Sequence, residues 1–129
     1  MGQKLQPDWL RAVLAGKGRV RPYLHTRMPI FGDANAAPLA ADLLVADGAP
    51  DADPAQAFAA GDAAAGRKLL GTEGGVGCIT CHGIGDRKGL CMEALSLTGA
   101  AQRYQPAWFK HNLIAPMEAR PGTLMPSFW

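Results

Sequence analysis

Apolar positions along the chain recur at helical spacing, and no stretch shows the strict apolar–polar alternation of a half-buried strand. The clearest case is Leu39 and Leu43, which stand four positions apart and therefore share one face of a helix. Asp33 or Asn35 is expected to cap this helix, which runs to about Ala46. These patterns predict an all-α fold.

Local end signals predict three more helices. Asp62 is expected to cap a helix over residues 63–70, which closes at Gly71. Pro7 and Pro106 suit the first turn of two short helices, because a residue in that turn needs no backbone N–H.

The two proline-opened helices belong to an internal repeat. The sequence QPDWLR at residues 6–11 matches QPAWFK at residues 105–110, and an Arg-Pro pair follows both at the same spacing. TRMPIF at residues 26–31 then matches TLMPSF at residues 123–128. A chance match of this length and order is improbable, so the chain carries two copies of one unit.

Residues 5–32 and 104–129 are these two copies, and each joins a Trp-bearing helix to a loop with a Met-Pro pair. A single methionine in such a loop is usually core filler. Met28 and Met125 occupy equivalent positions in the two copies, and this equivalence favours a ligand role for the thioether.

Composition excludes some classes of partner. The chain has 13 Lys and Arg against 11 Asp and Glu, so it lacks the basic footprint of a nucleic-acid binder. No window approaches the roughly 18 consecutive apolar residues of a membrane span. We therefore expect neither a nucleic-acid partner nor a membrane-spanning segment.

The chemistry-bearing motif is Cys78-Ile79-Thr80-Cys81-His82, the C-x-x-C-H pattern of covalent c-type haem attachment. Residues three apart on a helical turn face the same way, so both thiols can meet one porphyrin edge. His82 can then supply the proximal imidazole to the iron. One covalently bound haem c is the expected cofactor, and it would supply apolar core to a chain rich in Ala and Gly.

With these residues in place, residues 60–129 resemble a class I c-type cytochrome domain. Residues 62–70 look like the family's first helix, residues 106–114 like its later helix, and Met125 like its distal ligand. The resemblance implies a small helical domain around one haem with His82 and Met125 as axial ligands. It also implies one-electron transfer as the function, with no catalytic residues.

The resemblance divides the chain into three parts. Residues 1–46 resemble the tail of one such domain, with a distal loop around Met28 and a C-terminal helix but no haem motif. Residues 47–60 contain prolines and aspartates and are expected to be a linker. Residues 61–129 resemble the head of the next domain, without the family's C-terminal helix.

This order leaves the distal ligand open. The single haem could take Met125, which we prefer, or Met28, within one chain or by exchange between chains in a domain-swapped homo-oligomer. His111 and Met117 are weaker candidates. The expected apolar surroundings of the haem are Ile79, Leu95, Leu97, Leu113 and Phe128. Three basic residues could ring the exposed haem edge, although solvated surface charge is their more common role: Arg87, Lys88 and Arg103.

Two other functions are compatible with the same residues. A weakly ligated haem could bind a gas or act as a sensor. A zinc module of the Cys₃His type is the less favoured alternative, since the adjacency of its second cysteine and its histidine fits tetrahedral geometry poorly. Its ligands would be Cys78, Cys81, His82 and Cys91.

Haem attachment through C-x-x-C-H is normally made outside the cytoplasm, so a periplasmic or otherwise exported location is expected. Residues 1–9 show no apolar run of the signal-peptide type, which fits a piece of a longer exported protein. Redox proteins that meet an exposed haem edge through small, transient contacts are the expected partners.

Overall fold

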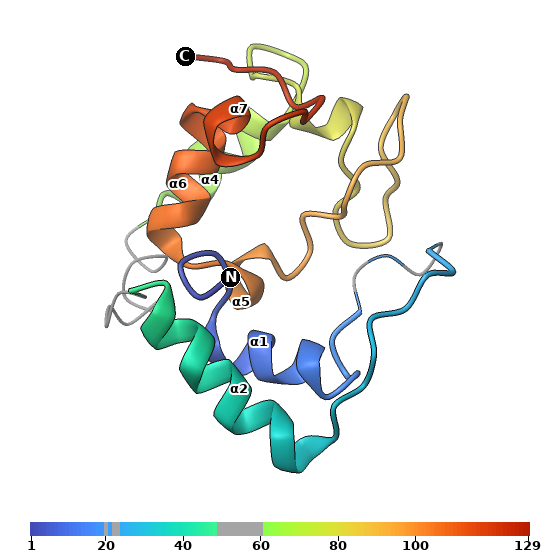
Figure 1. The fold of residues 1–129 in the computed structure, drawn as a ribbon. Coiled ribbons are helices and arrows are strands. Elements are labelled where there is room, and N and C mark those ends of the chain that lie inside the picture. Colours follow the sequence, from blue (N-terminus) through green and yellow to red (C-terminus); the bar gives the residue numbers. More distant parts are fainter. Residues whose placement is uncertain (20, 22–23, 49–60) are drawn as a thin grey trace. The chain divides into compact units, whose positions relative to one another are not determined.

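The computed structural model describes residues 1–19, 21, 24–48 and 61–129 (Figure 1). Its described part is helical and has no β-strand, which confirms the all-α class. The helices are α1 (Pro7–Leu14), α2 (Asp33–Ala46), α4 (Ala63–Leu70), the 3₁₀ turn η1 (Cys78–Thr80), α5 (Ala100–Arg103), α6 (Pro106–Ile114) and α7 (Pro116–Ala119).

The chain forms two compact units. One unit contains Met1–Pro54 together with Ala101–Trp129, and the other contains Ala55–Ala100. The two repeat copies therefore belong to the same unit, and the C-x-x-C-H motif belongs to the other. The division of the sequence into residues 1–46, 47–60 and 61–129 rests on the resemblance to a cytochrome family. It stays a prediction. From residue 49 on, the expected linker lies outside the described residues.

The first unit has a small apolar core between α1 and α2, which lie side by side (Figure 1). Leu39 and Leu43 pack on this core together with Trp9, as their shared helix face predicts. Small residues carry the closest part of the contact, since Ala36 and Ala40 of α2 are buried. The buried members of the core are Leu5, Leu10, Leu14, Ala36 and Ala40.

The start of α2 differs from the prediction. Its N-cap is Gly32, at φ 76°, and no side chain caps the first turn. Asp33 is the first helical residue, and the Asn35 side chain donates back to the Phe31 carbonyl at 2.9 Å. The expectation that Asp33 or Asn35 caps the helix was wrong, because a glycine in the left-handed region redirects the chain one residue earlier.

The two repeat copies pair with each other where their helices begin. Leu5 and Tyr104 form an antiparallel bridge. Beside it, the Gln6 backbone N–H donates to the Arg103 carbonyl, and the Gln105 backbone N–H donates to the Lys4 carbonyl, both at 2.9 Å. The copies thus contribute the same atoms to the contact, which is the signature of a local two-fold relationship.

The second unit begins with α4, whose ends agree with the prediction. The Asp62 carboxylate accepts from the backbone N–H groups of Ala64 and Ala65 at 2.9 and 3.0 Å. Gly71 follows the last helical residue, although its backbone is extended rather than left-handed. Across residues 61–100 no side chain is fully buried, so this part of the chain has no apolar core of its own.

Candidate functional site

The C-x-x-C-H motif folds into a single 3₁₀ turn. Gly77 precedes it at φ 73°, a conformation that glycine adopts without strain. The backbone N–H of His82 donates to the Cys78 carbonyl at 2.9 Å, and that of Cys81 donates to the same carbonyl at 3.2 Å. Because positions i and i+3 of a 3₁₀ turn eclipse each other, Cys78 and Cys81 lie on one side of it.

All three cysteines are free thiols. Cys78 and Cys81 are half-buried, whereas Cys91 is exposed. Burial raises the pKa of the Cys78 thiol, with a smaller contribution from the neighbouring Cys81. Burial therefore disfavours ionisation of the Cys78 thiol.

His82 is oriented by a backbone carbonyl. Its Nδ1 lies 2.6 Å from the Leu95 oxygen, and the ring is half-buried. Since a carbonyl can only accept, Nδ1 is the protonated nitrogen and Nε2 keeps its lone pair. This is the arrangement by which proteins fix the tautomer and direction of a metal-ligating histidine.

The carbonyl of Leu95 belongs to a segment that runs beside the motif. Its N–H groups at Leu90, Cys91 and Ala94 donate to the carbonyls of Ile79, Thr80 and Cys81 at 3.1, 2.9 and 2.8 Å. Gly89 stands at the start of this segment and lets its backbone pass close to the motif. A Cβ there would lie 2.6 Å from the Cys81 oxygen and 2.7 Å from the Met92 oxygen.

The second Met-Pro loop holds its sulfur next to a polar side chain. Met125 is half-buried, and its Sδ lies 3.8 Å from the Asn112 amide nitrogen. Asn112 stands on α6, and the Ser127 hydroxyl donates to the Ile114 carbonyl at 3.2 Å, so the loop is closed against the end of that helix. The loop that carries the Met125 thioether is thus held against α6, the helix of the same repeat copy.

The first Met-Pro loop is more open. Met28 is 47% exposed, and Ile30 and Phe31 beside it are 71% and 43% exposed. The Phe31 N–H donates to the Leu14 carbonyl at 3.4 Å, so this loop also closes on the end of its helix.

The remaining candidates are mostly at the surface. The exposed ones are His111, Met117, Arg87, Lys88 and Phe128. The half-buried ones are Ile79, Leu95, Leu97 and Leu113. Arg103 is a correction: it was expected on the surface around a haem, and it is only 4% exposed. Its guanidinium lies 5.3 Å from the Tyr104 ring.

Within the described residues, no group of three or more His, Cys, Asp or Glu side chains is arranged to hold a metal ion. The four residues of the alternative zinc site therefore do not form a metal-binding group in the structure. A helix long and apolar enough to cross a membrane is likewise missing from the described part.

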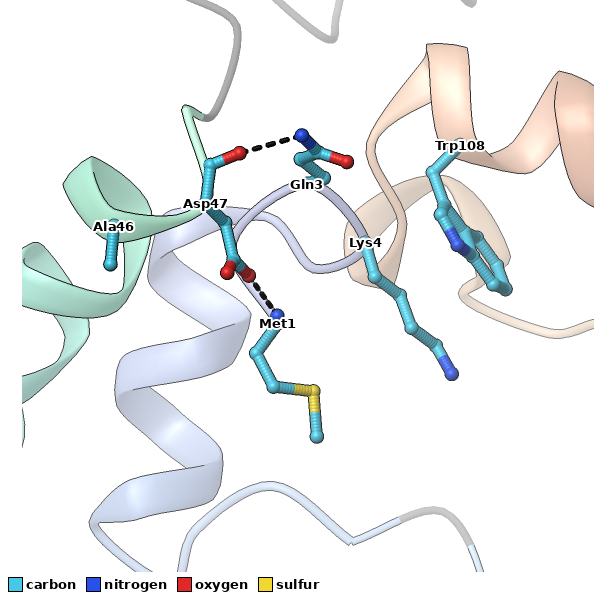
Figure 2. A pocket seen from close by; sticks show the side chains of 6 residues that line it. All are labelled: Met1, Gln3, Lys4, Ala46, Asp47 and Trp108. Carbon is cyan, nitrogen blue, oxygen red and sulfur yellow. Dashed lines mark hydrogen bonds and ion pairs between the residues drawn. The ribbon is translucent and has the colours of Figure 1, made fainter. Parts of the chain in front are cut away.

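A pocket of about 520 Å³ lies in the first unit, and none of the expected haem ligands lines it (Figure 2). The Gln3 side chain donates to the Asp47 carbonyl at 2.6 Å, and Lys4 places its Nζ 4.7 Å from the Trp108 ring. Burial lowers the pKa of Lys4, helped by the charges of Arg120 and Arg21. These contacts connect the first residues of the chain to the end of α2 and to the second repeat copy.

Comparison of the chain with known protein families, with curated proteins and with solved structures gave no match.

Three features near the candidate ligands, two in the second unit and one in the first, were not predicted. The Leu95 carbonyl and Gly89 act through the backbone, and a backbone contact leaves no mark at the position of its partner in the sequence. Asn112 could have been found by aligning the two repeat copies. The alignment shows a polar amide in the second copy at the position where the first copy has the apolar Val13.

Proposed function

We propose that the chain carries one haem c, attached through Cys78 and Cys81, and transfers single electrons. His82 would be the proximal ligand and Met125 the distal ligand. Haem iron supplies a one-electron ferric–ferrous couple, and a His/Met pair raises its potential relative to two histidines. The chain's own residues attach, orient and shield the group.

The observation that carries the proposal is the contact between His82 Nδ1 and the Leu95 carbonyl. It leaves Nε2 as the free lone pair beside two thiols on one turn. A ligating histidine needs this tautomer, because the iron takes the lone pair of the unprotonated nitrogen. Tetrahedral zinc binding is less well supported, since Cys78, Cys81, His82 and Cys91 do not form a group that could hold a metal ion.

The packing of residues 61–100 points in the same direction. This segment has ordered turns and backbone hydrogen bonds but no buried side chain. Burial of apolar surface is the main favourable term in folding, so a large apolar group bound at the motif would supply what the segment lacks. Ile79, Leu95 and Leu97, which are half-buried, are the residues placed to gain most from it.

The proposed roles of the other residues are structural. Gly89 and the segment from residue 90 to 97 would keep the His82 imidazole in place, and Asn112 would hold the Met125 sulfur. Ligands that are held rigidly lower the reorganisation energy of electron transfer, because the surroundings of the iron move little when its charge changes. Redox proteins would meet the haem edge transiently, in a periplasmic or otherwise exported compartment.

The axial ligation is tested by replacing each candidate methionine with leucine, which keeps the apolar volume and removes the sulfur. Met125→Leu is expected to abolish the long-wavelength absorption band of Met-ligated ferric haem. Met28→Leu and the surface control Met117→Leu are expected to keep it. Loss of the band in Met28→Leu with retention in Met125→Leu would overturn the assignment of Met125.

A further inference from the structure

The chain has two Met-Pro loops and one haem motif. We propose that the first loop, residues 24–31, is half of a second haem site. It would take a c-type haem carried by a C-x-x-C-H segment of a separate polypeptide, with Met28 as the ligand to that iron. This inference rests on the proposed function of Met125, because Met28 is assigned through its equivalence with Met125.

The structure supports this equivalence beyond the sequence match. Gln6 and Gln105 are the N-caps of α1 and α6, with φ/ψ of −65°/147° and −63°/135°. Both helices continue from a proline at the first position. The two copies therefore enter their helices along the same path, and the pairing at Gln6 and Gln105 relates them by a local two-fold.

The ends of the copies correspond as well. The first loop returns to its helix through the Phe31 N–H and the Leu14 carbonyl, and the second through the Ser127 hydroxyl and the Ile114 carbonyl. In each copy, the methionine lies two or three residues before this closing contact. Both loops thus close on the end of their own helix, through different groups, and the two methionines occupy matched positions of the repeat.

The two loops differ in what surrounds the sulfur. Met125 is half-buried beside Asn112, whereas Met28 is 47% exposed and has Val13 at the position equivalent to Asn112. Leu24, Ile30 and Phe31 are also exposed, at 43%, 71% and 43%. These exposed apolar residues belong to the same loop as Met28 and are available for contact with a porphyrin face.

The occupant follows from the chemistry of the repeat. A methionine thioether is an established axial ligand of c-type haem iron, and the equivalent loop is assigned to a haem that is held by a C-x-x-C-H segment. The chain's own haem is satisfied by Met125 under the proposed function. The haem for Met28 must therefore be carried by another segment with the same motif.

The probe for this site is a short ferric haem peptide that contains one C-x-x-C-H motif, acetylated at its amino end, titrated into the haem-loaded protein. Its iron has a histidine on one side and an open position on the other. Binding to Met28 is expected to add a second long-wavelength Met-to-iron band to that of the protein's own haem, up to one equivalent of peptide.

The variants separate the outcomes. Met28→Leu is expected to lose the added band while keeping the protein's own band, and Met117→Leu is expected to keep both. Absence of an added band with the wild-type protein, or its persistence in Met28→Leu, would overturn the inference. A protein without its own Met-ligated band before titration would instead refute the proposed function.

Discussion

Gln6 and Gln105 make reciprocal contacts: each donates its backbone N–H to a carbonyl of the other's segment at 2.9 Å. Their side chains do the same, with Gln6 Nε2 3.1 Å from the Tyr104 carbonyl and Gln105 Nε2 3.3 Å from the Leu5 carbonyl. The two repeat copies begin about three quarters of the chain length apart, and these contacts join them within one unit. The expected effects of several substitutions follow from this and from the motif.

The buried member of the pair is expected to matter most. Gln105 is 2% exposed, so Gln105→Ala removes a donor from the enclosed Leu5 carbonyl and should cost roughly 1–3 kcal/mol of the free energy of unfolding. Gln6→Ala should cost less, because its contacts are partly exposed. Gln102, exposed on α5, is the control for glutamine replacement. Denaturant unfolding of the haem-loaded protein measures all three; equal stability of Gln105→Ala and Gln102→Ala would contradict the pairing.

Gly89 is expected to tolerate no side chain. Its Cβ would meet two carbonyl oxygens at 2.6 and 2.7 Å, so Gly89→Ala should cost about 1–3 kcal/mol through overpacking and should displace the segment that contacts His82. Gly66→Ala is the matched control. A Cβ there meets no described atom of its own unit within 4 Å, and alanine should stabilise the α4 helix by about 0.5–1 kcal/mol.

Thermal unfolding of these two glycine variants gives the readout. A Gly89→Ala protein as stable as the wild type would show that the segment from residue 89 to 97 does not pack against the motif as described.

Asn112 is expected to tune the iron through Met125. Its amide donates to the sulfur, and hydrogen bonds to ligand sulfurs raise the reduction potential by favouring the electron-richer state. Asn112→Leu should therefore lower the potential, by up to about 59 mV, the shift that corresponds to a tenfold change for one electron. A redox titration checks the direction. Val13→Leu, at the equivalent position of the first copy, should leave the potential unchanged; a fall of the same size there would contradict the assignment.

Thiol labelling distinguishes the three cysteines. In the haem-loaded protein, only the exposed Cys91 should react with an alkylating reagent, because the other two thiols are consumed by attachment. In haem-free chain, burial raises the pKa of Cys78, so its labelling should increase only as the pH rises through that raised value. Peptide mass analysis locates the label, and modification of Cys78 or Cys81 in the haem-loaded protein would contradict covalent attachment.

Local signals predicted much of the fold. Asp62 caps α4 because its side chain bonds N–H groups two and three residues ahead, a contact that the sequence shows directly. The cap of α2 was missed, since a left-handed glycine and a capping side chain compete for the same role and Gly32 takes it.

Long-range contacts were beyond the sequence. The repeat was visible from the matched residues, but the pairing of Gln6 with Gln105 depends on backbone groups that any residue carries. The same holds for His82: the motif predicts the imidazole, whereas the Leu95 carbonyl that orients it lies 13 residues away and has no signature. The burial of Arg103, which is 4% exposed, likewise has no signal in the sequence.

The central claim is that Cys78 and Cys81 hold one haem covalently. The most direct test is the intact mass and pyridine absorption spectrum of the denatured chain, after expression in an exported form with haem-maturation machinery. One haem is predicted to remain bound to each chain after denaturation, and replacement of both cysteines by serine is predicted to remove it. A colourless chain with the mass of the polypeptide alone, produced beside a control cytochrome that matures normally, would contradict the account.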